Sequence, residues 1–177
     1  MALCHEIVQY LTHRYLLHSS NKTMMRILRH SVHHTTKASR GISACYMSSV
    51  DFFLEIVLPY LIPLTLVGGG GTDVRFHYLV AGLGAMGGVY EHSGYDFGVR
   101  LRKQPKSIDG AENSKLQIPR FLIWILAGIL DNRSHGEHHA QSNVSFADGF
   151  GSPGACDTLF GTRFNLSQRN QALAYKE

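Results

Sequence analysis

A chain of 177 residues with a net charge of +4 and 44% hydrophobic residues is long enough for one domain with a buried core. Its basic residues gather at 22–40 and 100–106 without interleaved aromatic residues, so nucleic acid is not expected as a partner. The three cysteines are odd in number and far apart, so they give no disulfide framework and favour a reducing compartment.

Two helices are expected near the N-terminus. Residues 3–18 repeat large apolar side chains at helical spacing, and residues 24–34 are read as a second helix. A polar turn at 19–23 separates the two, and residues 35–43 have the composition of a loop.

An apolar segment follows at 52–67, with Asp51 and Glu55 near its start and Pro59 and Pro63 inside it. A helix that crosses a membrane needs about 20 apolar residues. The segment is short and interrupted by prolines, so we expect a spanning or half-inserted membrane helix, with a buried helix of a soluble protein as the alternative. The four glycines that come next predict a loop.

Two further apolar segments lie in the second half of the chain. Residues 76–91 contain Gly84 and Gly88, a G-x-x-x-G pair that suits close helix packing in lipid. Residues 119–131 are too short to span, so we expect a helix at the membrane boundary or in the core. A polar, basic linker is expected between them at 98–118.

The sequence 82–87 fits G-x-G-x-x-G, the fingerprint of a dinucleotide-binding site. That fingerprint needs a strand before it, a helix after it and an acidic residue about 20 positions later. Here the residues 20 positions later are basic, at 100–103, so an NAD(P)-dependent oxidoreductase is only the third-ranked interpretation.

Nine of the eleven histidines fall in four groups. Imidazole is the commonest metal ligand in proteins, and H-x-x-H-H on a helix places its three histidines on one face. The spacing of His13 and His18 should splay the two rings apart, which suits a wide cavity. Nine rings exceed what one ion holds, so we expect a binuclear metal site. The nine candidate ligands are His13, His18, His30, His33, His34, His92, His135, His138 and His139.

Other interpretations of the histidines are weaker. His5 and His77 are isolated and are read as ordinary polar residues. Structural zinc sites usually have four ligands and often use cysteine, and neither condition fits here. In His135-Gly-Glu-His-His139 the glutamate stands in the wrong place for a zinc protease.

The ordered motifs resemble the fatty acid hydroxylase superfamily, which includes the sterol desaturases. The resemblance covers about residues 5–163, in the order H-x4-H, H-x-x-H-H, H-S-G-Y-D, H-x-x-H-H and D-x-L-F-G-T. The last motif stands here as Asp157 to Thr162, and Asn143 precedes it. His92-Ser-Gly-Tyr-Asp96 leans toward the sterol and sphingoid-base branches.

The resemblance implies an all-α fold in which membrane-embedded helices carry a histidine-rich cap with two iron ions, although zinc can replace iron on isolation. It implies an enzyme of the endoplasmic reticulum membrane, multi-pass, with its metal site facing the cytosol. It also implies that the enzyme hydroxylates or desaturates a lipid with O2 and electrons from cytochrome b5 and its reductase. The lipid would be a sterol, a sphingoid base or a fatty acyl chain.

Family members usually have membrane spans before the first histidine group. We therefore expect that these spans are missing from a domain at 1–163, which a polar tail follows at 164–177. The alternative function is a truncated, non-catalytic, histidine-rich metal-binding membrane protein.

The chain departs from its acyl-chain-hydroxylating relatives at the third group, where Asp96 replaces a histidine. A tenth ligand would be Asp96, water or nothing, and His77 is a remote candidate. Glu91, Asp96 and Glu137 are candidates to orient imidazoles through their second nitrogen. The expected walls of a lipid path are Phe52, Phe53, Tyr60 and Trp124.

Overall fold

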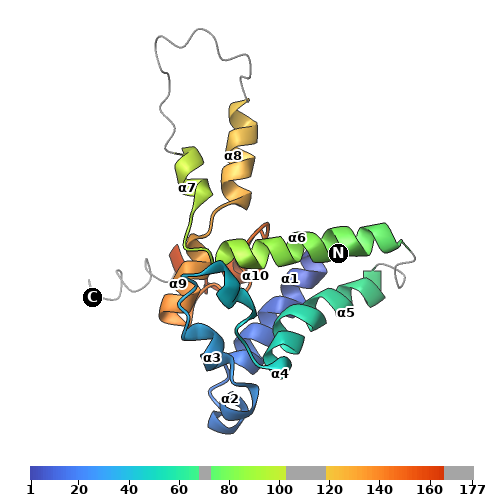
Figure 1. Cartoon of the computed structure of the whole chain (residues 1–177), viewed down its shortest axis with the longest axis vertical. Helices are drawn as coiled ribbons and strands as arrows, with labels where there is room; N and C mark the ends of the chain where they lie inside the picture. The colour runs from blue at the N-terminus through green and yellow to red at the C-terminus, as the bar shows by residue number, and fades with distance from the viewer. Residues whose placement is uncertain (68–72, 103–118, 166–177) are drawn as a thin grey trace.

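In the computed structural model, which describes residues 1–67, 73–102 and 119–165, the regular elements are all helices (Figure 1). This confirms the all-α prediction for the described part of the chain. The α-helices before residue 49 are α1 (Ala2–Leu11), α2 (Lys22–Leu28) and α3 (His30–His34), and the 3-10 helix η2 (Gly41–Cys45) follows them. The others are α4 (Ser49–Phe52), α5 (Leu58–Val67), α6 (Val74–Glu91), α7 (Phe97–Arg102), α8 (Arg120–Ile129), α9 (Arg133–Gln141) and α10 (Ala155–Leu159). Two π-helical turns, η1 (Thr12–Leu17) and η3 (Phe53–Val57), continue α1 and α4.

The turn η1 changes the direction of the histidines that follow α1. The amide of His18 donates to the carbonyl oxygen of His13 at 2.9 Å, an i to i+5 bond. This wider turn brings the rings of His13 and His18 to 5.0 Å between centroids. The expectation that these rings splay apart was therefore wrong, because it assumed the 3.6-residue turn of an α-helix.

The expected helix at 24–34 is two helices. Asn21 caps α2 by accepting hydrogen bonds from the amides of Thr23 and Met24. Arg29 adopts φ 58° and ψ 24°, the left-handed conformation, and so separates α2 from α3. Because of this break, α3, which carries three histidines, does not continue along the axis of α2.

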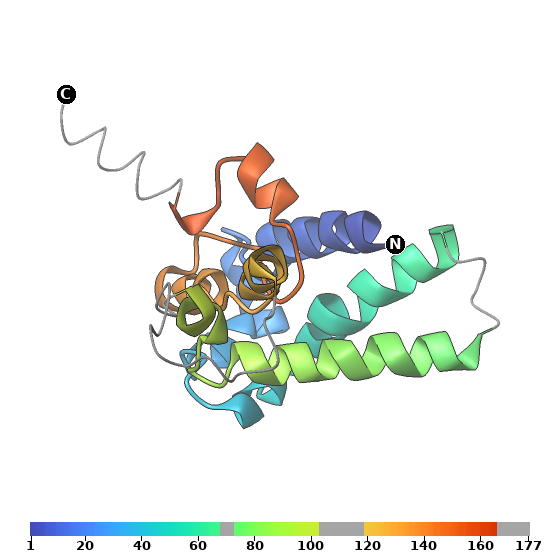
Figure 2. The same cartoon turned by 90° about the horizontal axis from the view of Figure 1, so that it is seen from above.

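The segment α4–η3–α5 runs as one helix from Ser49 through both prolines. Residues Ser49–Leu66 are long and apolar enough to cross a membrane, by length and composition only. Among the described residues no second helix passes that test. The helix α6 runs beside α5 (Figures 1 and 2). Many of the large apolar side chains of α6 are exposed.

The dinucleotide fingerprint lies inside α6. Gly82, Gly84 and Gly87 all lie within one continuous helix, so the strand and turn that the fingerprint requires are absent there. The dinucleotide interpretation is therefore contradicted. A Cβ atom added at Gly84 or Gly88 would meet no atom within 4 Å, so no described helix packs closely on that pair.

The expected linker at 98–118 begins later than predicted, because α7 occupies its first part. A Cβ on Gly98 would lie 2.5 Å from the carbonyl oxygen of Ala127, so α7 and α8 make a close backbone contact. The two helices project from the rest of the molecule (Figure 1). The rest of that linker, the glycine loop at 68–71 and most of the tail at 164–177 lie outside the described residues.

The buried interior is mainly polar. Its apolar cluster consists of Tyr10, Phe146, Ala147 and Cys156. Six of the histidines and several carboxylates are also buried. Large apolar side chains instead lie exposed on α6 and α8, among them Tyr78 and Trp124. The centre of the molecule is therefore organised around histidines rather than around aliphatic packing.

Candidate metal centre

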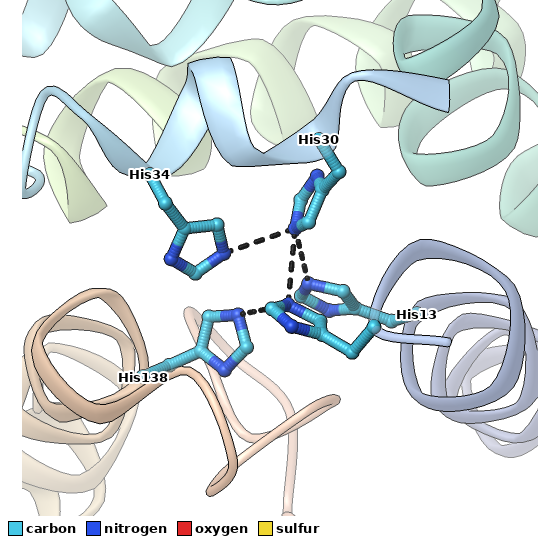
Figure 3. A group of neighbouring side chains, drawn as sticks. His13, His30, His34 and His138 are labelled. Carbon is cyan, nitrogen blue, oxygen red and sulfur yellow. Dashed lines mark hydrogen bonds between the residues drawn. The ribbon is translucent and has the colours of Figure 1, made fainter. Parts of the chain in front are cut away.

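The structure brings together the nine histidines that the sequence grouped. They come from η1 and the residue after it, from α3, from the end of α6 and from α9. Figure 3 shows His13, His30, His34 and His138 pointing toward one another from three separate segments. His77 lies elsewhere, where its Nδ1 is 2.5 Å from the hydroxyl of Tyr60.

Five rings form the first cluster, called here the five-histidine group. One nitrogen from each lies within 4.8 Å of the others. The Nε2 atom of His30 is 3.1 Å from that of His13 and 3.0 Å from that of His34. The members of the group are His13, His18, His30, His34 and His138.

The remaining rings form the second cluster, called here the four-histidine group. His33, His92 and His139 offer nitrogens within 4.8 Å of one another. The Nε2 atom of His135 lies 3.3 Å from that of His92, which joins His135 to them. The two groups adjoin, since the rings of His34 and His139 are stacked with centroids 4.5 Å apart.

Several rings are fixed in one tautomer by their outer nitrogen. Nδ1 of His13 donates to the carbonyl oxygen of Phe146 at 2.7 Å, and Nδ1 of His138 donates to that of Val144 at 2.7 Å. Nδ1 of His92 donates to a backbone carbonyl in the same way. A neutral imidazole with its hydrogen on Nδ1 presents a lone pair at Nε2. The short contacts between Nε2 atoms therefore bring their lone pairs close together. A bound cation would relieve the repulsion between these lone pairs.

Burial keeps these imidazoles neutral. Burial, reinforced by neighbouring histidines, lowers the pKa of His18 and of His33 to about 3. The same causes lower the pKa of His34 to about 4. The pKa values of His13 and His138 fall well below the ordinary value, again mainly through burial. Neutral imidazole is the form that binds metals.

The donor set fits a metal ion such as iron. For a metal–nitrogen bond of about 2.1 Å, ligands at right angles lie about 3.0 Å apart and tetrahedral ligands about 3.4 Å apart. The Nε2 separations of 3.0 to 3.3 Å fall in this range. Both ring nitrogens of His139 are buried without a described hydrogen-bond partner, so one of them is available to bind a metal ion.

The D-x-L-F-G-T motif holds the loop that orients two ligands. The fully buried Asp157 accepts hydrogen bonds from the amides of Phe146 and Ala147 at 2.9 and 2.7 Å. It also accepts one from the hydroxyl of Thr162 at 2.6 Å. Asp157 thus fixes the segment whose carbonyl groups hold His13 and His138.

The three carboxylates expected to orient ligand imidazoles differ in what they contact. Glu91 Oε2 lies 3.9 Å from Nδ1 of His135, and its Oε1 accepts from the amide of Phe150. Glu137 Oε2 accepts from Gln141 at 2.6 Å. Asp96 Oδ1 accepts from the amide of Val99 at 2.8 Å. No described hydrogen bond or ion pair joins Glu137 or Asp96 to a histidine, so the structure supports only Glu91 of the three.

Sequence reasoning missed Asp51 and Glu55. Nδ1 of His30 donates to Asp51 Oδ1 at 2.8 Å and lies 3.5 Å from Glu55 Oε2. A signal was present, because two carboxylates four residues apart interrupt an otherwise apolar segment. From the sequence alone they mark only the polar start of an expected membrane helix.

Among the described residues, the side chains expected to line a lipid path do not meet in one pocket. Trp124 is 77% exposed, Phe52 and Phe53 are each a little under half exposed, and Tyr60 contacts His77. An open pocket of about 510 Å³ reaches His18 instead, and polar residues form much of its lining. Its walls are Arg14, Tyr15, His18, Ser19, Ser20, Ser142, Asn143, Phe146 and Thr162.

Comparison with known proteins agrees with this centre. A family model described as fatty acid hydroxylase matches residues 1–162, which includes all nine histidines and the D-x-L-F-G-T motif. Comparison with curated proteins and with solved structures gave no match. Because the family model covers most of its length, the chain belongs to the fatty acid hydroxylase family.

Proposed function

We propose that this chain hydroxylates or desaturates a carbon–hydrogen bond of a membrane lipid, using two iron ions and O2. Members of the family are membrane-associated, oxygen-dependent oxidoreductases. The observation that carries the proposal is the pair of adjoining histidine groups, each with several neutral nitrogens turned inward.

Each group would hold one ion. The five-histidine group offers five ring nitrogens and the four-histidine group offers four, with a stacked pair of rings at their border. When bound, iron supplies the redox chemistry that oxidation of an unactivated carbon–hydrogen bond requires and that zinc lacks.

The chain's own part is to prepare and protect this centre. Backbone carbonyl groups at 144 and 146 keep hydrogens on the outer nitrogens of His138 and His13, so both rings face inward as ligands. His30, His33 and His138 are almost completely buried, so water reaches this part of the centre poorly, whereas the open pocket gives access at His18.

The remaining elements of the proposal rest on the family resemblance. Electrons would come from a cytochrome b5-type donor and its reductase, and the protein would lie in the endoplasmic reticulum membrane with its metal site facing the cytosol. The segment Ser49–Leu66, which has the length and composition of a membrane span, is consistent with this location.

Lipid analysis tests the proposal. The full chain, its His138→Ala variant and its Glu137→Gln variant are expressed in matched cells, and hydroxylated and unsaturated lipids are measured by mass spectrometry. Glu137 is the matched control, since it lies beside His138 in sequence but bonds Gln141. We expect an oxidised lipid with the wild type and with Glu137→Gln, and none with His138→Ala. The same oxidised lipid with all three proteins, or with none of them, contradicts the proposal.

A further inference from the structure

Two buried carboxylates lie on one helix beside the five-histidine group. Asp51 is fully buried and Glu55 is 7% exposed, and they stand four residues apart in the apolar segment α4–η3–α5. Carboxylates in such surroundings destabilise a fold unless they have a partner. The burial of both carboxylates therefore indicates that they have a specific partner and role.

Their described partner is His30. Nδ1 of His30 donates to Asp51 Oδ1 at 2.8 Å, and Glu55 Oε2 follows at 3.5 Å. No described lysine or arginine makes an ion pair with either carboxylate. Asp51 Oδ2 and Glu55 Oε2 are buried without a hydrogen-bond partner. The carboxylate groups of both residues thus point toward the same imidazole, that of His30.

The backbone around this contact is anchored on both sides. The hydroxyl of Ser48 caps α4 by accepting from the amide of Asp51, and it donates to the carbonyl oxygen of Leu28 at 2.8 Å. Leu28 lies two residues before His30. One serine therefore ties the start of the carboxylate-bearing helix to the end of α2, just before α3.

His30 differs in this respect from the other oriented ligands. Nδ1 of His13, of His138 and of His92 donates to an uncharged backbone carbonyl group. A carboxylate is a stronger acceptor than a carbonyl group, and behind a metal-binding imidazole it orients the ring and raises its basicity. His30 also occupies a central place, because its Nε2 contacts those of His13, His18 and His34.

We infer that Asp51, backed by Glu55, is a positioning residue that holds the Nε2 lone pair of His30 toward the five-histidine group and strengthens metal binding there. This inference rests on the proposed metal centre. It predicts that the two groups bind metal unequally, because the nearest carboxylate to the four-histidine group, Glu91, lies 3.9 Å from Nδ1 of His135.

Cobalt titration tests the inference without an activity assay. The full-length metal-free protein in detergent is titrated with Co²⁺ against a competing chelator, and binding is followed by the visible absorption of cobalt–imidazole complexes. We expect two binding phases with the wild type. In Asp51→Asn the tighter phase should weaken by about 10- to 100-fold while the other phase keeps its affinity. The matched control, Glu137→Gln, should bind like the wild type.

Each other outcome decides against the inference. Unchanged affinity in both phases of Asp51→Asn overturns it, and so does equal weakening of both phases, which would indicate a general structural defect. If circular dichroism shows that Asp51→Asn is unfolded, Glu55→Gln is titrated in its place. We again expect the tighter phase alone to weaken. Unchanged affinity, or equal weakening of both phases, again contradicts the inference. Absence of cobalt binding by the wild type would overturn the proposed metal centre as well, whereas lipid oxidation with an unchanged Asp51→Asn titration would overturn only the positioning role.

Discussion

The five-histidine and four-histidine groups differ in how their rings are held. In the first, the outer nitrogens of His13, His30 and His138 all donate to protein oxygens. In the second, Nδ1 of His92 donates to the carbonyl oxygen of Gly88, whereas both nitrogens of His139 are buried without a described hydrogen-bond partner. The described hydrogen bonds thus fix more rings in the first group than in the second, so the fold prepares the first metal site more fully.

The largest expected effect comes from removing one ligand of each group. His138 and His139 are neighbours on α9 but belong to different groups. We expect His138→Ala and His139→Ala each to lose about one of two ions, from different groups. Both variants should lower lipid oxidation more than about 100-fold. This exceeds the loss that usually follows replacement of a residue that only hydrogen-bonds a metal ligand. Elemental analysis and lipid analysis of the purified variants measure this. Loss of both ions in both variants would erase the distinction between the groups.

A smaller effect is expected at the support of the five-histidine group. Asp157→Ala leaves the amides of Phe146 and Ala147 and the hydroxyl of Thr162 without their acceptor. Each buried donor without a partner costs about 1–3 kcal/mol of stability. We expect a lower free energy of unfolding and weaker metal binding at the five-histidine group, as measured by denaturant unfolding and Co²⁺ titration. An unchanged free energy of unfolding would show that the motif does not support the site.

Acid should destabilise the metal-free protein gradually. Burial lowers the pKa of His18 and His33 to about 3 and of His34 to about 4, below the 6.5 of an unfolded histidine. At these histidines the unfolded state therefore binds more protons between pH 6.5 and about 4, so their contribution to stability falls as the pH falls. Burial raises the pKa of Glu91 to about 7, which acts in the opposite direction, but the buried histidines are more numerous. The slope is at most about 1.4 kcal/mol per pH unit for each histidine. Unfolding of the metal-free protein across this range measures it, and stability that rises toward acid would contradict neutral, buried rings.

Much of the centre could be predicted from the sequence, because its spacing rules are local. H-x-x-H-H places His135, His138 and His139 on one face of α9, as a helix of regular pitch requires. The apolar segments are also predictable as helices, since their length and composition largely determine this structure.

The parts that were not predicted depend on contacts distant in sequence or on unusual backbone. The π-helical turn before His18 and the left-handed Arg29 leave no periodicity in the sequence. Asp51 meets His30 only after the chain folds back across 20 intervening residues. Conversely, the glycine pattern at 82–87 fits a helix as well as a phosphate-binding turn, and only the surrounding structure separates the two.

Metal content is the most direct test of the binuclear centre. Elemental mass spectrometry of the full chain, purified in detergent and reconstituted with ferrous iron, should find about two irons per chain, one for each histidine group. A chain that binds no iron after reconstitution, with its helical circular dichroism intact, would contradict the account.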